Sequence, residues 1–256
     1  MKQSLFEKIK NSKKYKDLSD EIIRKEIKEY LRKNPDSKRY KNKKIVKDIK
    51  AELHKLTGRF QIKKRKKKQE YLNKKDYEGI LSTNLSTKER LKDYDKLYSL
   101  IFSTTGRPKI ILDIGCGINP CSYPIMKIKS KYLAYDINQG DIDFVNEFFK
   151  KFNIKGKAEI LDLRDIDNVK KLPKADLCLM FKIIDPLEKG KGHKLSEKII
   201  KNLKCKYIVA SFATKTISRK PMKYPYRGWF ERMLNRNKFK WEKINTNSEV
   251  YYIVKI

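Results

Sequence analysis

Residues Ile110–Pro120 read IILDIGCGINP, an apolar run that ends in an acid and then in two glycines spaced by one residue. This pattern is typical of a buried parallel strand that turns sharply beneath a bound nucleotide. Gly115 and Gly117 have no Cβ, so the backbone can bend there and come close to a ligand. The stretch predicts an α/β fold with a ligand site where this strand ends. The alternative is a tight turn in an α/β domain of another kind.

Two further features indicate which ligand the turn accepts. Pro120 stands where a dinucleotide-binding G-x-G-x-x-G motif has its third glycine, which disfavours a pyrophosphate cofactor and favours a smaller adenosine ligand. A second apolar stretch, Lys131–Asp136, ends in an acid about 20 residues after the glycines, where a ribose-binding carboxylate belongs. Together these features predict S-adenosylmethionine as the cofactor.

The composition is strongly basic. The 256 residues include 64 Lys and Arg against 31 Asp and Glu, a formal net charge of +33. Such a charge opposes compaction and calls for a polyanionic partner, for which nucleic acid is the first candidate and a membrane surface the alternative. The Lys- and Ile-rich composition is also typical of archaeal or thermophilic proteins, although acids would then rise together with bases.

Cysteine usage and hydropathy narrow the class of protein further. The four cysteines form no C-x-x-C pair, so neither a disulfide framework nor a metal site is predicted. The N-terminus has no apolar leader, and no stretch approaches the length of a membrane span. We expect a soluble, cytoplasmic protein, monomeric and without a membrane partner.

The chain divides into a helical region, residues 1–104, and an α/β region, residues 105–256. Two apolar stripes at helical spacing support the first assignment. One stripe ends before Pro35, and the other is closed by Gly58. The first hundred residues hold 32 basic and 15 acidic side chains, so we expect this region to bind RNA.

A run of six cations lies within this region. It is either a solvated face or an arm that contacts phosphates, and its position between a helical region and a cofactor fold favours the second interpretation. The run consists of Lys63, Lys64, Arg65, Lys66, Lys67 and Lys68.

Residues Ser86–Glu89 read STKE, the pattern of a capping box that opens a helix. Arg90 would then lie in the first turn, where the helix dipole does not favour a cation. A cation in this unfavourable place indicates a functional role for Arg90, for example binding a ligand carboxylate. An ordinary surface arginine explains the pattern equally well.

From Lys109 onward, predicted strands and helices alternate, which indicates a mostly parallel sheet covered on both faces. The last two strands are separated only by a turn and therefore predict an antiparallel terminal hairpin. The predicted strands are 109–113, 131–136, 157–161, 175–181, 206–211, 239–244 and 249–255. The predicted helices are 139–152, 165–172, 194–203 and 227–236.

Polar residues follow the carboxyl ends of the predicted strands, where open α/β sheets bind ligands. They are Asp113, Asp136, Asp162, Lys182, Ser211, Thr214 and Lys215. No catalytic triad or metal-binding motif accompanies them. Methyl transfer from a sulfonium requires neither, because an acceptor with an in-plane lone pair, such as guanine N7, needs mainly to be held in line.

Seven blocks of sequence, in this order, resemble one family. The chain is similar to the aminoglycoside-resistance 16S ribosomal RNA (guanine-N7) methyltransferases, the FmrO-like family, from about residue 80 to the end. One departure is Ala213, where we expect the family's proline. The blocks are Leu85–Leu91, Leu112–Pro120, Ala134–Ile137, Phe181–Lys182, Ser211–Lys215, Trp229–Glu231 and Ser248–Tyr252.

The resemblance implies a Rossmann-like methyltransferase fold with a helical N-terminal extension. It also implies functional roles for individual residues. Arg90 would hold the methionine carboxylate, Asp136 the ribose, and Asp162 with Leu163 the adenine. Asp113, Gly115, Cys116, Gly117, Ile137 and Phe181 would complete the cofactor site. Lys182, Ser211 and Lys215 would lie near the target base as the catalytic set. Lys215, Arg219 and Arg227 would join the basic run in binding RNA.

The sequence thus predicts a methyltransferase that uses S-adenosylmethionine to modify guanine N7 in ribosomal RNA, free or within the small ribosomal subunit. Transfer RNA is an alternative substrate. Two other classes remain open: a methyltransferase acting on a protein or small molecule, and a catalytically silent RNA-binding protein with the same fold. The basic helical region disfavours a small substrate, which needs no such field.

Overall fold

The computed structural model describes residues 2–57, 65–188, 193–216, 220–223 and 225–256. Its centre is a seven-stranded sheet in the order β3-β2-β1-β4-β5-β7-β6. The first five strands are parallel, whereas β7 pairs antiparallel with both β5 and β6. The strands are β1 (Ile110–Ile114), β2 (Lys131–Asp136), β3 (Gly156–Ile160), β4 (Ala175–Phe181), β5 (Cys205–Ala213), β6 (Lys240–Asn245) and β7 (Glu249–Lys255). The predicted sheet and its terminal hairpin are confirmed.

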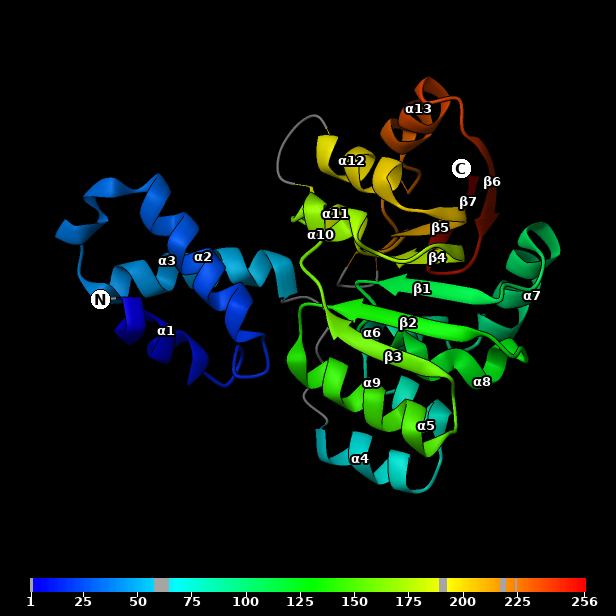
Figure 1. Cartoon of the computed structure of the whole chain (residues 1–256), viewed down its shortest axis with the longest axis horizontal. Helices are drawn as coiled ribbons and strands as arrows, with labels where there is room; N and C mark the ends of the chain where they lie inside the picture. Colours follow the sequence, from blue (N-terminus) through cyan, green and yellow to red (C-terminus); the bar gives the residue numbers. More distant parts are fainter. Residues whose placement is uncertain (1, 58–64, 189–192, 217–219, 224) are drawn as a thin grey trace.

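Helices cover both faces of the sheet (Figure 1). Neighbouring residues of one strand, such as Ile111 and Leu112, point to opposite faces and enter different hydrophobic clusters. One face packs against α4 (Arg65–Asn73), α5 (Tyr77–Leu81), α7 (Tyr94–Thr105), α8 (Tyr123–Met126) and α9 (Gln139–Lys151). The other face packs against α10 (Ile166–Lys170), α11 (Ile184–Leu187), α12 (Lys194–Asn202) and α13 (Gly228–Arg236).

The first three helices, α1 (Lys2–Lys10), α2 (Asp20–Lys33) and α3 (Asn42–Thr57), have a hydrophobic cluster of their own. We call them the helical unit. As expected, α2 stops before Pro35, while Gly58 lies outside the described residues. Helices α4, α5 and α7 instead share the cluster of the sheet. The boundary expected at residues 104 and 105 therefore does not coincide with the division between clusters, which falls between α3 and α4.

The helical unit lies beside the carboxyl ends of β1, β2 and β3, whose arrows point toward it in Figure 1. Backbone contacts join the two parts: Ser19 N donates to Ile137 O over 3.2 Å, and Gly140 N donates to Asp17 O over 3.1 Å. Ile137 also packs against the cluster of the helical unit. The unit therefore borders the edge of the sheet where a ligand site was predicted.

The expected capping box is wrong. Helix α6 (Leu85–Arg90) begins after Asn84, whose side chain accepts a hydrogen bond from Ser86 N over 3.0 Å. Asn84 thus caps the helix two residues before the expected position, Ser86. Arg90 consequently lies in the last turn, where the helix dipole favours a cation. The chain then turns, and a separate helix, α7, begins at Tyr94.

Among the described residues, no helix combines the length and apolar character needed to cross a membrane.

Candidate cofactor site

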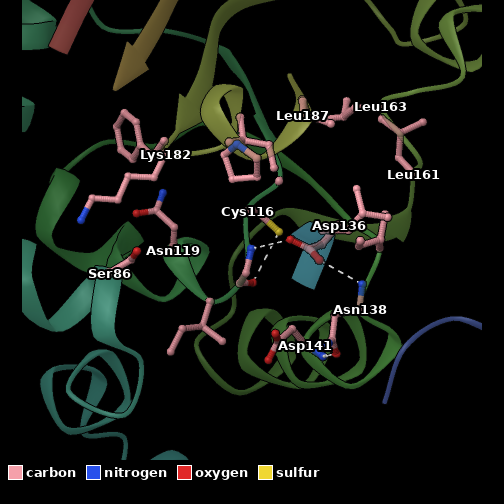
Figure 2. A pocket seen from close by; sticks show the side chains of 18 of the residues that line it. Ser86, Cys116, Asn119, Asp136, Asn138, Asp141, Leu161, Leu163, Lys182 and Leu187 are labelled. Carbon is pink, nitrogen blue, oxygen red and sulfur yellow. Dashed lines mark hydrogen bonds between the residues drawn. The ribbon is translucent and has the colours of Figure 1, made fainter. Parts of the chain in front are cut away.

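A cavity opens at the carboxyl ends of β1, β2, β3 and β4 (Figure 2). Its empty volume is about 1060 Å³, open solvent at the mouth included. It is lined by Leu56, Asn84, Ser86, Thr87, Arg90, Gly115, Cys116, Gly117, Ile118, Asn119, Asp136, Ile137, Asn138, Asp141, Leu161, Asp162, Leu163, Arg164, Phe181, Lys182, Ile183, Pro186 and Leu187. Most of the cofactor-binding residues expected from the sequence are thus brought together at the predicted edge.

The glycine turn forms the floor of this cavity. Both glycines have positive φ, +68° at Gly115 and +50° at Gly117, a conformation that side chains with a Cβ rarely adopt. A Cβ at Gly115 would lie 2.4 Å from the Ile183 side chain, whereas a Cβ at Gly117 would meet nothing within 4 Å. Gly115 is therefore required for packing, and Gly117 leaves open the space that a ligand could enter.

Asp136 stands beside the turn, as Figure 2 shows. Its two carboxylate oxygens accept hydrogen bonds over 2.9 Å from the backbone nitrogens of Gly117 and Asn138. A carboxylate has about four lone-pair sites, so it can still accept from two further hydroxyls. Burial, with Asp141 nearby, raises the pKa of Asp136 to about 6, so the group is mainly ionised at neutral pH.

A buried ion-pair network closes another side of the cavity. Glu249, on β7, is fully buried and accepts from Arg90 Nε over 2.7 Å, while Lys182 Nζ lies 3.1 Å from the same carboxylate. Lys182 also pairs with Glu89 over 2.7 Å. Burial alone would raise the pKa of Glu249, but Arg90 and Lys182 hold it below its usual range. Three elements that are distant in sequence meet at this carboxylate.

Lys182 also has an unusual backbone. Its φ is +55°, and its amide donates to the carbonyl and hydroxyl oxygens of Ser211 over 3.1 Å each. A non-glycine residue in this region is strained and persists only where its surroundings hold it. The strain turns the chain out of β4 at the cavity wall.

Two predicted site residues lie behind the wall rather than in it. Asp113 does not line the cavity and accepts over 2.8 Å from Asn119 Nδ2 and over 2.7 Å from Tyr132 Oη. Burial raises the pKa of Asp113 to about 6. Ser211 is fully buried and donates to Glu249 Oε2 over 2.6 Å. Neither side chain lines the cavity, but Asp113 binds Asn119 and Ser211 binds the Lys182 backbone, and both of these residues do line it. The assignment of Asp113 to the cofactor and of Ser211 to the target base stays a prediction.

Asp162 lies at the opposite end, between Leu161 and Leu163, which also line the cavity. Arg164 donates to both of its oxygens, and Lys25 of α2 donates to Oδ2 over 2.8 Å. Burial alone would raise the pKa of Asp162, but these donors lower it. This end of the cavity therefore combines apolar walls with a fully engaged carboxylate.

The residues expected to bind RNA differ from one another in exposure and in ion pairing. Lys66 and Lys67 are exposed on α4. Lys68 instead pairs with Asp141 over 3.0 Å and packs over the Phe144 ring, so it is not part of a free arm. Lys215 is exposed outside the cavity lining, and Arg227 pairs with Asp185 over 2.8 Å. Lys63, Lys64, Arg219 and the side chain of Arg65 lie outside the described residues.

Sequence reasoning assigned no role to Glu249 or Asn119, although both hold Arg90 in place. A signal for Glu249 was present, since it is an acid at the start of the apolar strand Val250–Val254. Asn119 belongs to the block Leu112–Pro120 that resembles the family, but nothing in the sequence relates it to Arg90. Only the fold shows that its amide bridges Arg90 and Asp113.

The family model described as ribosomal RNA methyltransferase (FmrO) matches residues 11–253. The chain belongs to this family. The resemblance inferred from the sequence is thereby confirmed, and the match extends into the helical unit, beyond the part in which we had found it.

Relatives of this FmrO family member include curated and solved proteins. A 16S rRNA (guanine(1405)-N(7))-methyltransferase of Proteus mirabilis is 33% identical over 184 residues, which are 68% of this chain and 63% of the relative. One of Serratia marcescens is 31% identical over 182 residues, 70% of each. The solved structure of the 16S rRNA methylase RmtB has a TM-score of 0.81 at 26% identity, covering 100% of this chain and 98% of that chain.

The matched region spans less than two thirds of the length of the Proteus relative. Both curated relatives are bacterial, so an archaeal origin gains no support from them.

The residues of this FmrO member fit S-adenosylmethionine. Gly117 leaves space where a Cβ would point, and Asp136 retains acceptor capacity for two ribose hydroxyls. Arg90 contributes a cation to the lining, and Leu161 with Leu163 forms apolar wall at the other end. A cationic group, hydroxyl acceptors and an apolar slot are what the methionine carboxylate, ribose and adenine require in turn.

Replacing Gly117 by alanine is expected to weaken binding of S-adenosylhomocysteine strongly while leaving the fold intact, because the new methyl group enters the cavity. Gly106, at the C-cap of α7, also has a positive φ, +71°, and open surroundings, so Gly106→Ala is a control away from the cavity. The change at Gly117 should lower the free energy of unfolding by about 1 kcal/mol. The change at Gly106 should lower it by more, because its ψ of 174° lies in a region that essentially only glycine adopts. Calorimetric titration and thermal unfolding measure both quantities, and equal affinities in the two variants would contradict this placement of the cofactor.

Proposed function

We propose that this chain is an S-adenosylmethionine-dependent methyltransferase that modifies guanine N7 in 16S ribosomal RNA. The observation that carries the proposal is the cavity at the carboxyl ends of the parallel strands, where the glycine turn, Asp136 and Arg90 converge. Family membership and two curated relatives with this activity support it.

In this proposal, different residues of the chain bind different groups of the cofactor. The Asp136 carboxylate accepts from the ribose hydroxyls, Arg90 attracts the methionine carboxylate, and Leu161 and Leu163 exclude water around adenine. S-adenosylmethionine supplies an electrophilic methyl group on a positively charged sulfur. Arg90 cannot swing away from its position, because Glu249, Tyr94 and Asn119 all bind its guanidinium group.

The acceptor needs no general base, because guanine N7 has a lone pair in the plane of its ring. The protein contributes position: holding the two reactants in line supplies much of the rate. Lys182 lines the cavity with its charge balanced by Glu89 and Glu249. A balanced cation can orient a base without repelling the positively charged donor.

We propose that RNA docks on the basic surface of the helical unit and α4. The net charge of +33 supports this, since polyanion binding is dominated by phosphate contacts. Lys66, Lys67 and Lys215 are the described cations of the predicted set that are exposed and for which no ion pair was found. We further propose a cytoplasmic, monomeric enzyme that acts on the small ribosomal subunit, with transfer RNA as the alternative substrate.

The function is tested by incubating the protein with radiolabelled S-adenosylmethionine and, separately, small ribosomal subunits, free 16S RNA or transfer RNA. We expect methyl transfer to ribosomal RNA, seen by mass spectrometry of nucleosides as N7-methylguanosine, and declining steeply as salt increases. Label found only in protein or small molecules would contradict the proposal. Absence of cofactor binding in calorimetry would instead indicate a silent RNA-binding protein.

The affinity for S-adenosylhomocysteine is expected to be constant above pH 7 and to fall as pH drops through about 6, where Asp136 gains a proton and loses acceptor capacity. Asp136→Asn should weaken binding at pH 7.5 and remove most of this pH dependence. Asp113 has a similar pKa, so the variant is needed to separate the two carboxyl groups. Calorimetry between pH 5.5 and 7.5 provides the measurement, and a dependence unchanged in Asp136→Asn would refute the ribose assignment.

Charge reversal at Lys66 and Lys67 is expected to weaken RNA binding and to reduce the salt slope of log K by about 2, because each replaced lysine removes about one phosphate contact. Cofactor affinity should stay unchanged. Lys150 and Lys151, an exposed pair at the end of α9 away from the cavity, form the control. Filter binding at several salt concentrations measures the effect; an equal loss in both double variants would show that only net charge matters.

A further inference from the structure

The helical unit forms part of the cavity wall. Leu56 of α3 and Ile137, which packs against the cluster of that unit, both line the cavity. The hydrogen bonds from Ser19 to Ile137 and from Gly140 to Asp17 fix this edge. The part of the protein proposed to bind RNA is therefore in direct contact with the part proposed to bind the cofactor.

Two consecutive residues of α2 extend this contact into an ion-pair network. Lys25 Nζ lies 2.8 Å from Asp162 Oδ2, and Glu26 Oε2 lies 2.7 Å from Arg164 Nη1. Arg164 in turn donates to Asp162 over 2.9 Å and 3.0 Å. The four side chains form an unbroken chain of opposite charges from α2 to the loop after β3.

Burial makes this network more than a surface feature. Glu26 is 4% exposed and Asp162 is 9% exposed, so each carboxylate needs a partner that compensates for its lost hydration. Arg164 serves both, and Lys25 supplies the second cation. Removing either α2 residue changes the charge balance of the segment Leu161–Arg164, all four residues of which line the cavity.

The hydrogen bonds of Asp162 show what the network does. Its two oxygens accept from Arg164 N, Nε and Nη2 and from Lys25 Nζ, which fills about four lone-pair sites. In this arrangement Asp162 holds the loop in place rather than offering a free acceptor. The neighbouring apolar residues are positioned through it.

We propose that Lys25 and Glu26 are positioning residues of the cofactor site, and that through them RNA bound to the helical unit and cofactor bound in the cavity strengthen each other's binding. The inference rests on the proposed function and adds a mechanism of coupling to it. Because coupling free energies are reciprocal, RNA must raise the affinity for cofactor by the factor by which cofactor raises the affinity for RNA.

The test uses the full chain, S-adenosylhomocysteine and small ribosomal subunits. Lys25→Met and Glu26→Gln remove one charge each, and Lys28→Met and Glu29→Gln on the same helix are matched controls outside the network. We expect dissociation constants for S-adenosylhomocysteine about tenfold higher in the first pair, loss of the enhancement by subunits, and unchanged values in the controls. Lys25→Arg should restore both properties.

A steady-state measurement separates positioning from general loss of structure. The Michaelis constant for cofactor should rise in Lys25→Met while kcat at saturating cofactor stays near that of the natural protein. Lys25 is partly exposed, so this variant decides the question even if Glu26→Gln unfolds. Wild-type affinity and enhancement in Lys25→Met would overturn the inference while leaving the methyltransferase proposal intact. A natural protein that binds no cofactor would instead overturn the proposed function.

Discussion

The buried carboxylate of Glu249 is the constraint on which the rest of the site depends. It is fully buried and binds Arg90, Lys182 and Ser211, which come from α6, from the end of β4 and from β5. An isolated ionised carboxylate in the protein interior would be very costly, so its partners and its strand must come together for either to be stable. The insertion of β7 between β5 and β6 places Glu249 at the carboxyl end of β5, where it pairs with Ala213.

Further buried hydrogen bonds extend from Arg90, the partner of Glu249, to the residues around the glycine turn. Arg90 donates to Asn119, Asn119 donates to Asp113, and Tyr132 donates to Asp113 as well. This layer of hydrogen-bonded side chains lies under the glycine turn and connects it to the ion pairs. Side chains held in such a network lose little further freedom when a ligand arrives, which is the physical advantage of a preorganised site.

A second network, at the other end of the cavity, has a different consequence. Whereas Glu249 joins elements of the sheet domain to each other, Glu26 and Lys25 join the sheet domain to the helical unit. Lys68 makes a comparable link from the basic run to Asp141 in the cavity lining. The cations of this chain therefore serve two purposes: some face solvent, and others tie the basic segments to the cofactor site.

The sequence by itself determined the sheet, its terminal hairpin, the glycine turn and the family, because these depend on local periodicity and on residues adjacent in the chain. It also selected Arg90, although the expected place in a first helical turn was wrong. Only the tertiary structure decided that Asp113 and Ser211 lie behind the cavity wall and that Lys68 is ion-paired. It also decided that α4, α5 and α7 pack with the sheet. The physical reason is distance along the chain. Ion pairs such as Arg90 with Glu249 join residues that no sequence pattern relates, and they form where folding buries both charges together.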